Sequence, residues 1–324
     1  MQSLSCLSHV KRNNDDERLP APPVATFAHV ITDRSGSMCS MNGLQIPMNK
    51  KLLDETKDMA EKTNTPTFVT FTTFDDQVEH LTKNKNILDY DIPSEEDLHD
   101  SLAPRGTTRF VDTVLEAIEE LERSHKLYRK NLPRKIKALD PKIVRLINCT
   151  TDGMDNCSIH GAFELHDAMT KFRKNGGEAL LLAANMDAEV IGNQYGFNSD
   201  ISLTVHASDP DAIEFAFDSL RSQSQRVTSG GTPIPYTSLE RQTSQATPDL
   251  LPTPAFPSLR CPPPPLLQRS SGYGLMRQNA VVNTFDSDDD TYLLNLSPPP
   301  IQRARLLRRS NRIRGRPQNM KIKK

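Results

Sequence analysis

The sequence lacks the features that mark secreted and membrane proteins. None of its apolar runs approaches the ~20 consecutive residues that a transmembrane helix needs. The opening decapeptide, MQSLSCLSHV, has no continuous apolar region of the kind found in secretory signals, and acidic residues follow it closely. No internal repeat is visible either. We therefore expect an intracellular protein that does not associate with a membrane.

A disulfide framework is also missing. The chain has five cysteines, an odd number, and they are widely scattered without framework spacing. Such usage suits a reducing compartment, where thiols stay free. The five are Cys6, Cys39, Cys149, Cys157 and Cys261.

Apolar residues are scarce and charge is unevenly distributed. Hydrophobic residues make up 36% of the 324 positions, and there are 24 prolines, so part of the chain is expected to be unfolded. From residue 224 onward the chain has 15 Lys and Arg against 6 Asp and Glu, a net charge of +9. Since the whole chain carries −1, the first 223 residues carry −10. The sequence therefore predicts an acidic body and a basic tail.

Three segments follow from these patterns. Residues 1–24 are polar and interrupted by prolines, which predicts a disordered arm. Residues 25–223 alternate apolar runs of strand length with helical patterns. Residues 224–324 hold 14 of the 24 prolines and no sustained periodicity, which predicts a long disordered tail. Two stretches interrupt this tail, FDSDDDTYLLNL at residues 285–296 and a basic run at residues 303–324.

The middle segment predicts an α/β fold. Its apolar runs, among them VATFAHVIT, TFVTFTTF, KIVRLINCT and EALLLAAN, read as strands buried on both faces. The helical stripe at residues 110–127 is typical of the helices between such strands. We expect a doubly wound, mostly parallel sheet, in which ligands lie beyond the carboxyl ends of the strands.

Oxygen-bearing side chains gather at these predicted strand ends. DRSGS places Asp33, Ser35 and Ser37 at a spacing of two, directly after the first strand. GTT places Thr108 before a helix, and TDG places Asp152 at the end of another strand. Carboxylates and hydroxyls from three loops could surround one hard cation such as Mg²⁺, which takes about six oxygen ligands.

These motifs resemble the von Willebrand factor type A (vWA) domain and its metal-ion-dependent adhesion site. The family pattern Asp-x-Ser-x-Ser, then Thr in Gly-x-Thr, then Thr-Asp-Gly occurs here in that order, and the resemblance covers about residues 25–223. It implies that Ser35, Ser37 and Thr108 bind Mg²⁺ or Mn²⁺ through hydroxyls. Asp33 and Asp152 would bind directly or through water. Thr107 replaces the second glycine that the family usually has.

The resemblance also implies a function. In the family, a partner protein fills the open coordination position with an Asp or Glu carboxylate, so the metal joins two proteins. We therefore expect a metal-dependent protein–protein interaction module and no enzymatic activity. The alternative is a metal-dependent hydrolase, for which Asp155 or His160 would have to serve as general base.

Other chemistries receive less support. Cys149, Cys157 and His160 would suggest zinc, but Cys149 lies in an apolar strand and a fourth ligand is not evident. Ser35 or Ser37 as a nucleophile would need a neighbouring base and a glycine-flanked turn, and RSGSM offers neither.

The basic tail adds a possible nucleic-acid contact. Residues 303–324 hold 10 Lys and Arg and no acidic residue, which suits nuclear import or binding to any polyanion. Within them, RIRGRPQ resembles an AT-hook, whose core is here Arg314, Gly315, Arg316 and Pro317. That resemblance implies contact with the minor groove of A·T-rich DNA and hence a DNA-tethered scaffold. We expect cytoplasmic or nuclear localisation, or both.

Overall fold

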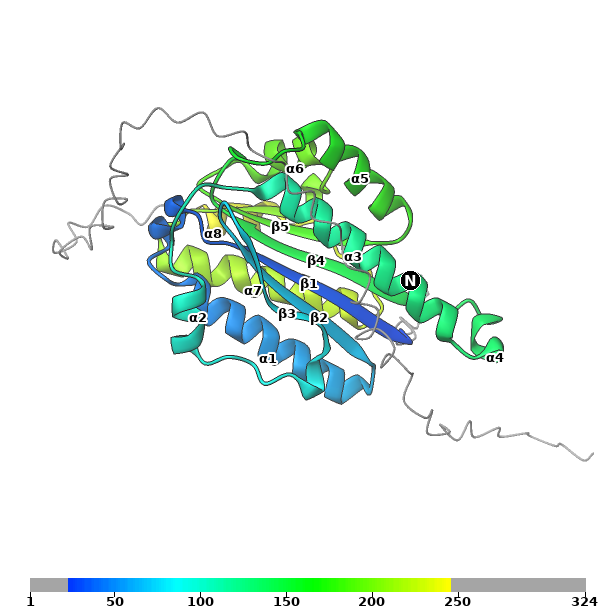
Figure 1. The fold of residues 1–324 in the computed structure, drawn as a ribbon. Coiled ribbons are helices and arrows are strands. Elements are labelled where there is room, and N and C mark those ends of the chain that lie inside the picture. Colours follow the sequence, from blue (N-terminus) through cyan, green and yellow to red (C-terminus); the bar gives the residue numbers. More distant parts are fainter. Residues whose placement is uncertain (1–22, 246–324) are drawn as a thin grey trace, which may run out of the picture.

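The computed structural model describes residues 23–245 (Figure 1). Nearly all of the predicted arm lies outside these residues. So do the acidic stretch at 285–296 and the AT-hook-like segment of the predicted tail.

The described residues form a six-stranded sheet in the order β3-β2-β1-β4-β5-β6. All neighbouring strands are parallel except β3, which pairs antiparallel with β2 at one edge. This is the strand order of doubly wound sheets, so the predicted fold class is confirmed. The strands are β1 (Ala25–Asp33), β2 (Thr67–Phe74), β3 (Val78–Asn86), β4 (Ile143–Thr151), β5 (Glu178–Ala184) and β6 (Ser202–Val205).

Burial explains why these segments are strands. Every residue of β1, β2 and β4 is buried, as expected for central strands covered on both faces. Strand β3 instead has mostly exposed or half-buried residues, which suits its place at the edge.

Helices cover both faces of the sheet (Figure 1). On one face lie α1 (Gln45–Thr63) and α7 (Pro210–Thr228), and on the other α3 (Phe110–Asn131), α5 (Ala162–Lys174) and α6 (Ala188–Tyr195). Each face has its own apolar core: Phe27, Phe110 and Phe172 lie in the core under α3 and α5, and Leu182 and Phe217 in the core under α7.

Shorter elements complete the fold. The acidic run SEEDLHD, which the sequence suggests is plain solvated surface, forms helix α2 with a capping box from Ser94 and Asp97 and with Leu98 buried. The short elements are η1 (Gly36–Met41), η2 (Ile87–Asp89), α2 (Glu95–Ser101), α4 (Arg134–Lys137), η3 (Ser199–Ile201) and α8 (Ser238–Ser244).

The ordered domain extends beyond residue 223, so the predicted boundary is too early. Helix α7 continues to Thr228, and α8 lies against β6, where the His206 amide donates to the carbonyl of Ser244 at 3.0 Å. Two isolated apolar residues, Val227 and Tyr236, anchor this segment in the core. Their neighbours are mostly Ser, Gln, Thr and Gly, so the average composition of the segment resembles that of a disordered tail.

None of the helices between residues 23 and 245 combines the length and apolar character that a membrane span requires.

The register of the strands brings the predicted site residues to one edge of the sheet. Asp33 pairs with Phe74 of β2, and its neighbour Thr32 pairs with Thr150 of β4. The residues that end or follow these strands, Asp33, Asp75 and Asp152, therefore lie at the same carboxyl edge of the sheet.

Candidate metal centre

Four of the five predicted ligands form one connected group at this edge. Oγ of Ser35 lies 3.1 Å from Oγ of Ser37, and Ser37 donates a hydrogen bond of 2.7 Å to Oδ1 of Asp152. The Ser35 amide donates to Oδ1 of Asp33 at 2.7 Å. Residues 115 positions apart thus meet at one point, with Ser35 buried and Ser37 open to solvent.

Asp33 is the most deeply buried residue of the group. Its Oδ1 accepts a hydrogen bond from the Ser35 amide, and its Oδ2 accepts one of 2.6 Å from the hydroxyl of Thr151. Burial raises the pKa of Asp33 to about 6, although these hydrogen bonds act to lower it. The nearby charge of Asp152 raises it further, and burial also raises the pKa of Asp152 itself. Two carboxylates that repel one another in a sheltered place favour a cation between them.

Thr108 lies close to the same group. We call the segments that contain DRSGS, GTT and TDG the first, second and third loops, and Thr108 belongs to the second. A Cβ atom built on Gly153 would lie 2.8 Å from Oγ1 of Thr108 and 3.4 Å from Oγ of Ser37. Both hydroxyls therefore face the small space beside Gly153. The Thr108 amide is held by the side chain of Asn156 at 2.8 Å, which fixes the second loop to the third. Glycine is required in TDG because a side chain there would press on Thr108.

The loop before Thr108 accommodates threonine at position 107. The left-handed conformation falls on Gly106, with φ of +65°, where a Cβ would meet Oδ1 of Asp76 at 2.5 Å. The Gly36 amide donates to the Gly106 carbonyl at 3.3 Å, which joins the first and second loops. One glycine is enough for this turn, so the replacement at Thr107 leaves Thr108 in place.

A buried ion-pair network, which the sequence reading missed, also joins these loops. Nε of Arg34 lies 3.1 Å from Oδ2 of Asp75, and Nε of Arg105 lies 2.6 Å from the same oxygen. The Arg105 amide donates to the Arg34 carbonyl, and the Arg109 amide to the Asp75 carbonyl, both at 2.8 Å. Burial acts to raise the pKa of Asp75, but Arg105, the Gln77 amide and the charge of Arg34 lower it overall. Asp75 thus fixes both ends of the loop that carries Thr108.

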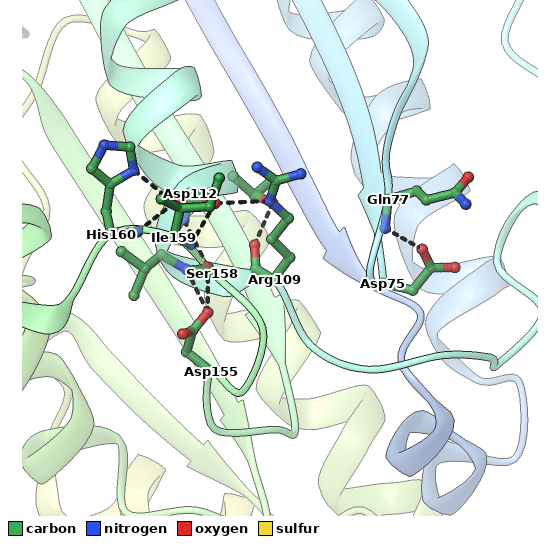
Figure 2. Close-up of polar contacts among 10 residues, drawn as sticks. Asp75, Gln77, Arg109, Asp112, Asp155, Ser158, Ile159 and His160 are labelled. Atoms are coloured by element: carbon green, nitrogen blue, oxygen red, sulfur yellow. Dashed lines mark hydrogen bonds and ion pairs between the residues drawn. The ribbon is translucent and has the colours of Figure 1, made fainter. Parts of the chain in front are cut away.

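Asp112, which follows Thr108 by one helical turn, fastens the third loop (Figure 2). Its carboxylate accepts hydrogen bonds from the backbone amides of Ile159 and His160, at 2.9 and 3.0 Å, and lies 2.8 Å from Nδ1 of His160. Arg109 donates to it at 2.8 Å. Burial opposes ionisation, but these donors hold the pKa of Asp112 well below its usual range.

The donor set fits a hard divalent cation. Two carboxylates and three hydroxyls are oxygen ligands of the kind that Mg²⁺ and Mn²⁺ prefer. Between residues 23 and 245, no three His, Cys, Asp or Glu side chains gather as a metal site, so the soft-ligand sites typical of zinc have no counterpart there. Cys149 is buried in β4 and burial raises its pKa far above the usual value, while Cys157 lies exposed in the third loop.

The architecture and the three loops together decide the fold type. The parallel sheet has one antiparallel edge strand, and the Asp-x-Ser-x-Ser, Gly-x-Thr and Thr-Asp-Gly motifs converge at its carboxyl edge. The chain has a vWA-type fold.

Solved structures with this fold are similar to the chain at low sequence identity. One is proximal thread matrix protein 1 from the mussel byssus with a zinc occupied MIDAS motif, at 16% identity and a TM-score of 0.39, over 63% of this chain and 46% of that one. Another is the SpRpn10 VWA domain, at 17% and 0.38, over 59% and 95%. A third is von Willebrand factor type A from Catenulispora acidiphila, at 14% and 0.40, over 63% and 43%. The chain spans less than half the length of the first and third. No family model matches the sequence, and no curated protein matches it.

Proposed function

We propose that this vWA fold binds Mg²⁺ or Mn²⁺ through Asp33, Ser35, Ser37, Thr108 and Asp152, and that the cation captures an Asp or Glu carboxylate of a partner protein. The convergence of three loops, distant in sequence, on two carboxylates and three hydroxyls is the observation that carries this proposal.

The chemistry of the ligands favours capture of an acidic side chain. Hydroxyls add no charge to the site, so a cation held largely by them keeps its affinity for an incoming carboxylate. The exposed position of Ser37 and the half-buried position of Asp152 leave one side of the site open to solvent. The buried position of Asp33 gives the cation a rigid floor.

The geometry gives no support to a hydrolase. The two candidate bases are both engaged in fastening the third loop: Asp155 accepts from the Val111 amide at 3.1 Å and from Ser158, and His160 is paired with Asp112. A cavity of about 680 Å³ is present near this edge, but none of the five proposed ligands and neither candidate base lines it.

The test is metal-dependent stability of the full chain. A ligand that binds only the native state raises its stability, by about 2.7 kcal/mol at a hundred times Kd. We expect Mg²⁺ and Mn²⁺ to raise the melting temperature of the wild type. The double variant Ser35→Ala/Asp152→Ala should retain its fold, by circular dichroism, and lose this increase.

A variant away from the site provides the control. Ser94→Ala removes a hydroxyl from the cap of α2 and should melt with an unchanged metal shift. An equal metal shift in the double variant would show that the five residues do not hold the cation. In a second stage, proteins retained by the wild type in Mg²⁺ should be released by chelator and should not be retained by Asp33→Ala.

A further inference from the structure

Three exposed apolar side chains follow the proposed ligand Asp152, in the loop after β4 and at the start of α5. Met154, Ile159 and Phe163 are 58%, 83% and 81% exposed, and all three lie within the twelve positions that follow Thr151. We refer to these three residues as the apolar rim. Single exposed apolar residues are ordinary, but three within ten positions, directly after a proposed ligand, favour an interaction surface.

The part of the apolar rim that contains Ile159 is held by hydrogen bonds. The amides of Ile159 and His160 are anchored on Asp112, and the Asp112 amide donates to Ser158 at 3.1 Å (Figure 2). The exposure of Ile159 therefore belongs to a fastened loop. A rigid apolar surface loses little entropy when a ligand covers it.

The chain leaves the described domain at the same edge. The carbonyl of Ser244 accepts the His206 amide just after β6. The neighbouring Val205 carbonyl accepts the amide hydrogen of Asn185. The side-chain nitrogen of Asn185 lies 3.5 Å from Oγ of Ser40, and Ser40 donates a hydrogen bond of 3.3 Å to Asp152. Figure 1 shows α8 and η1 at this end of the sheet and α4 at the opposite end. The described chain therefore ends at the sheet edge that carries the proposed site, a few residues away from Asp152.

These following residues contain one stretch with the matching chemistry. Residues 246–324 have five acidic residues, and four of them are Asp286, Asp288, Asp289 and Asp290. After Thr291 come Tyr292, Leu293 and Leu294, and no Lys or Arg lies between 285 and 296. An acid followed by apolar residues matches a cation bordered by an apolar rim.

We propose that residues 285–296 of the same chain occupy this edge, with one aspartate on the cation and Tyr292, Leu293 and Leu294 against the apolar rim. This inference rests on the proposed function. Residues 246–285 connect the described domain to this segment. A random chain of about 40 residues spans on the order of 35 Å, comparable with the diameter of the domain, which is long enough to reach the site. Tethering gives it an effective concentration of about 1 mM, enough to hold the site even with a weak intrinsic affinity. A partner protein must then compete with the chain's own segment.

The experiment adds a labelled peptide of residues 283–297 to two forms of the full chain in Mg²⁺. One is the wild type, and the other carries Asp286→Asn, Asp288→Asn, Asp289→Asn and Asp290→Asn. If the segment binds with a Kd of about 100 µM and tethering gives it an effective concentration of about 1 mM, competition weakens peptide binding to the wild type, so the variant should bind the peptide about tenfold more tightly. Chelator should abolish binding to both.

Matched variants locate the contact. Ile159→Ser/Phe163→Ser, placed in the four-aspartate variant, should weaken peptide binding, whereas Leu139→Ser, equally exposed next to α4, should not. A peptide with asparagine for all four aspartates should not bind.

The melting experiment separates the possible failures. If Mg²⁺ stabilises the wild type but the peptide binds neither form, this inference is wrong and the metal site stands. Equal peptide affinity for the two forms, or binding that persists in chelator, would also overturn it. Mg²⁺-dependent dimers in light scattering would show the segment acting between two copies instead. If no metal stabilises the chain, the proposed function itself fails.

Discussion

A Cβ atom added to Gly153 would lie 2.8 Å from Oγ1 of Thr108. The third loop therefore packs closely against the second at this point, with no room for a side chain. Real Cβ atoms do not approach a heavy atom so closely, so any larger residue must displace Thr108 or move the loop that contains Asp152.

Replacement of this glycine should therefore weaken metal binding more than it weakens the fold. We expect Gly153→Ala to lower Mg²⁺ affinity at least tenfold, measured by the metal-dependent shift in melting temperature. Gly161→Ala is the matched control, because its Cβ would meet only the end of the Glu164 side chain, at 3.0 Å. Equal metal shifts in both variants would contradict the placement of Thr108 among the ligands.

The Arg34–Asp75 pair predicts a large loss of stability. Both side chains are at most 2% exposed, so Asp75→Asn leaves the guanidinium of Arg34 buried with Glu79 as its remaining carboxylate partner. Breaking a buried pair on one side costs about 3 kcal/mol of unfolding free energy. Arg105→Ala removes the exposed partner of Asp75 and should cost less than about 1 kcal/mol. Urea unfolding of the two variants checks this, and similar losses would contradict it.

The fold and the site differ in how far the sequence determines them. Strands such as β1 and β4 carry apolar runs, and Asp33 and Asp152 stand at the ends of these runs, so the strands and the meeting of these two residues at one sheet edge were predictable. The partners of Asp112 were not, because the backbone amides of Ile159 and His160 leave no signal in the sequence. The burial of Arg34 was missed for a similar reason. Its carboxylate partners, Asp75 and Glu79, stand more than 40 positions away, and an arginine in a loop is usually solvated.

The C-terminal boundary of the domain was predicted too early for another reason. The prediction rested on composition averaged over many residues, whereas α8 is held by a capping box and a few specific contacts. Thr237 and Glu240 form that box, and Arg241 donates to the carbonyls of Ser199 and Ser202 at 3.0 Å. Such side chain–backbone contacts depend on tertiary structure that a window of residues does not contain.

His29 should make the domain sensitive to acid. It is buried in β1 with Nε2 2.7 Å from Oγ1 of Thr72, and burial first, then the charges of His80 and Lys83, lower its pKa to about 3. Between pH 6.5 and 3 the unfolded chain binds a proton at His29 and the folded chain does not. Stability from this group is therefore complete above pH 6.5 and falls with decreasing pH, by about 1.4 kcal/mol per pH unit.

The measurement is the free energy of unfolding against pH. His29→Gln should flatten the decline, whereas His99→Gln, at an exposed position, should not. Other groups also titrate in this window, and His125 and Asp33 are among those with large shifts. His125, with its pKa lowered to about 4 by burial and by neighbouring cations, adds to the decline, and Asp33 opposes it because its pKa is raised to about 6. An unchanged slope in His29→Gln would contradict the assignment.

The basic segment at residues 303–324 supports a last prediction, on nucleic acid. Any polyanion should bind its ten Lys and Arg, and binding should weaken steeply with salt because bound counterions are released. An AT-hook would also distinguish A·T-rich from G·C-rich DNA. Arg314 and Arg316 would lie along the narrow minor groove of A·T-rich DNA, where the negative potential is greatest, and Gly315 would allow close approach of the backbone.

The decisive measurement compares A·T-rich with G·C-rich duplex at physiological salt. If the hook is present, the full chain should prefer the A·T-rich duplex on the order of tenfold, which corresponds to about 1.4 kcal/mol. Arg314→Ala/Arg316→Ala should remove the preference. Lys323→Ala/Lys324→Ala removes the same charge outside the motif, so it should weaken binding to both duplexes alike and keep the preference. Equal affinity of the wild type for the two duplexes would leave charge alone as the basis of binding, because charge does not distinguish base composition.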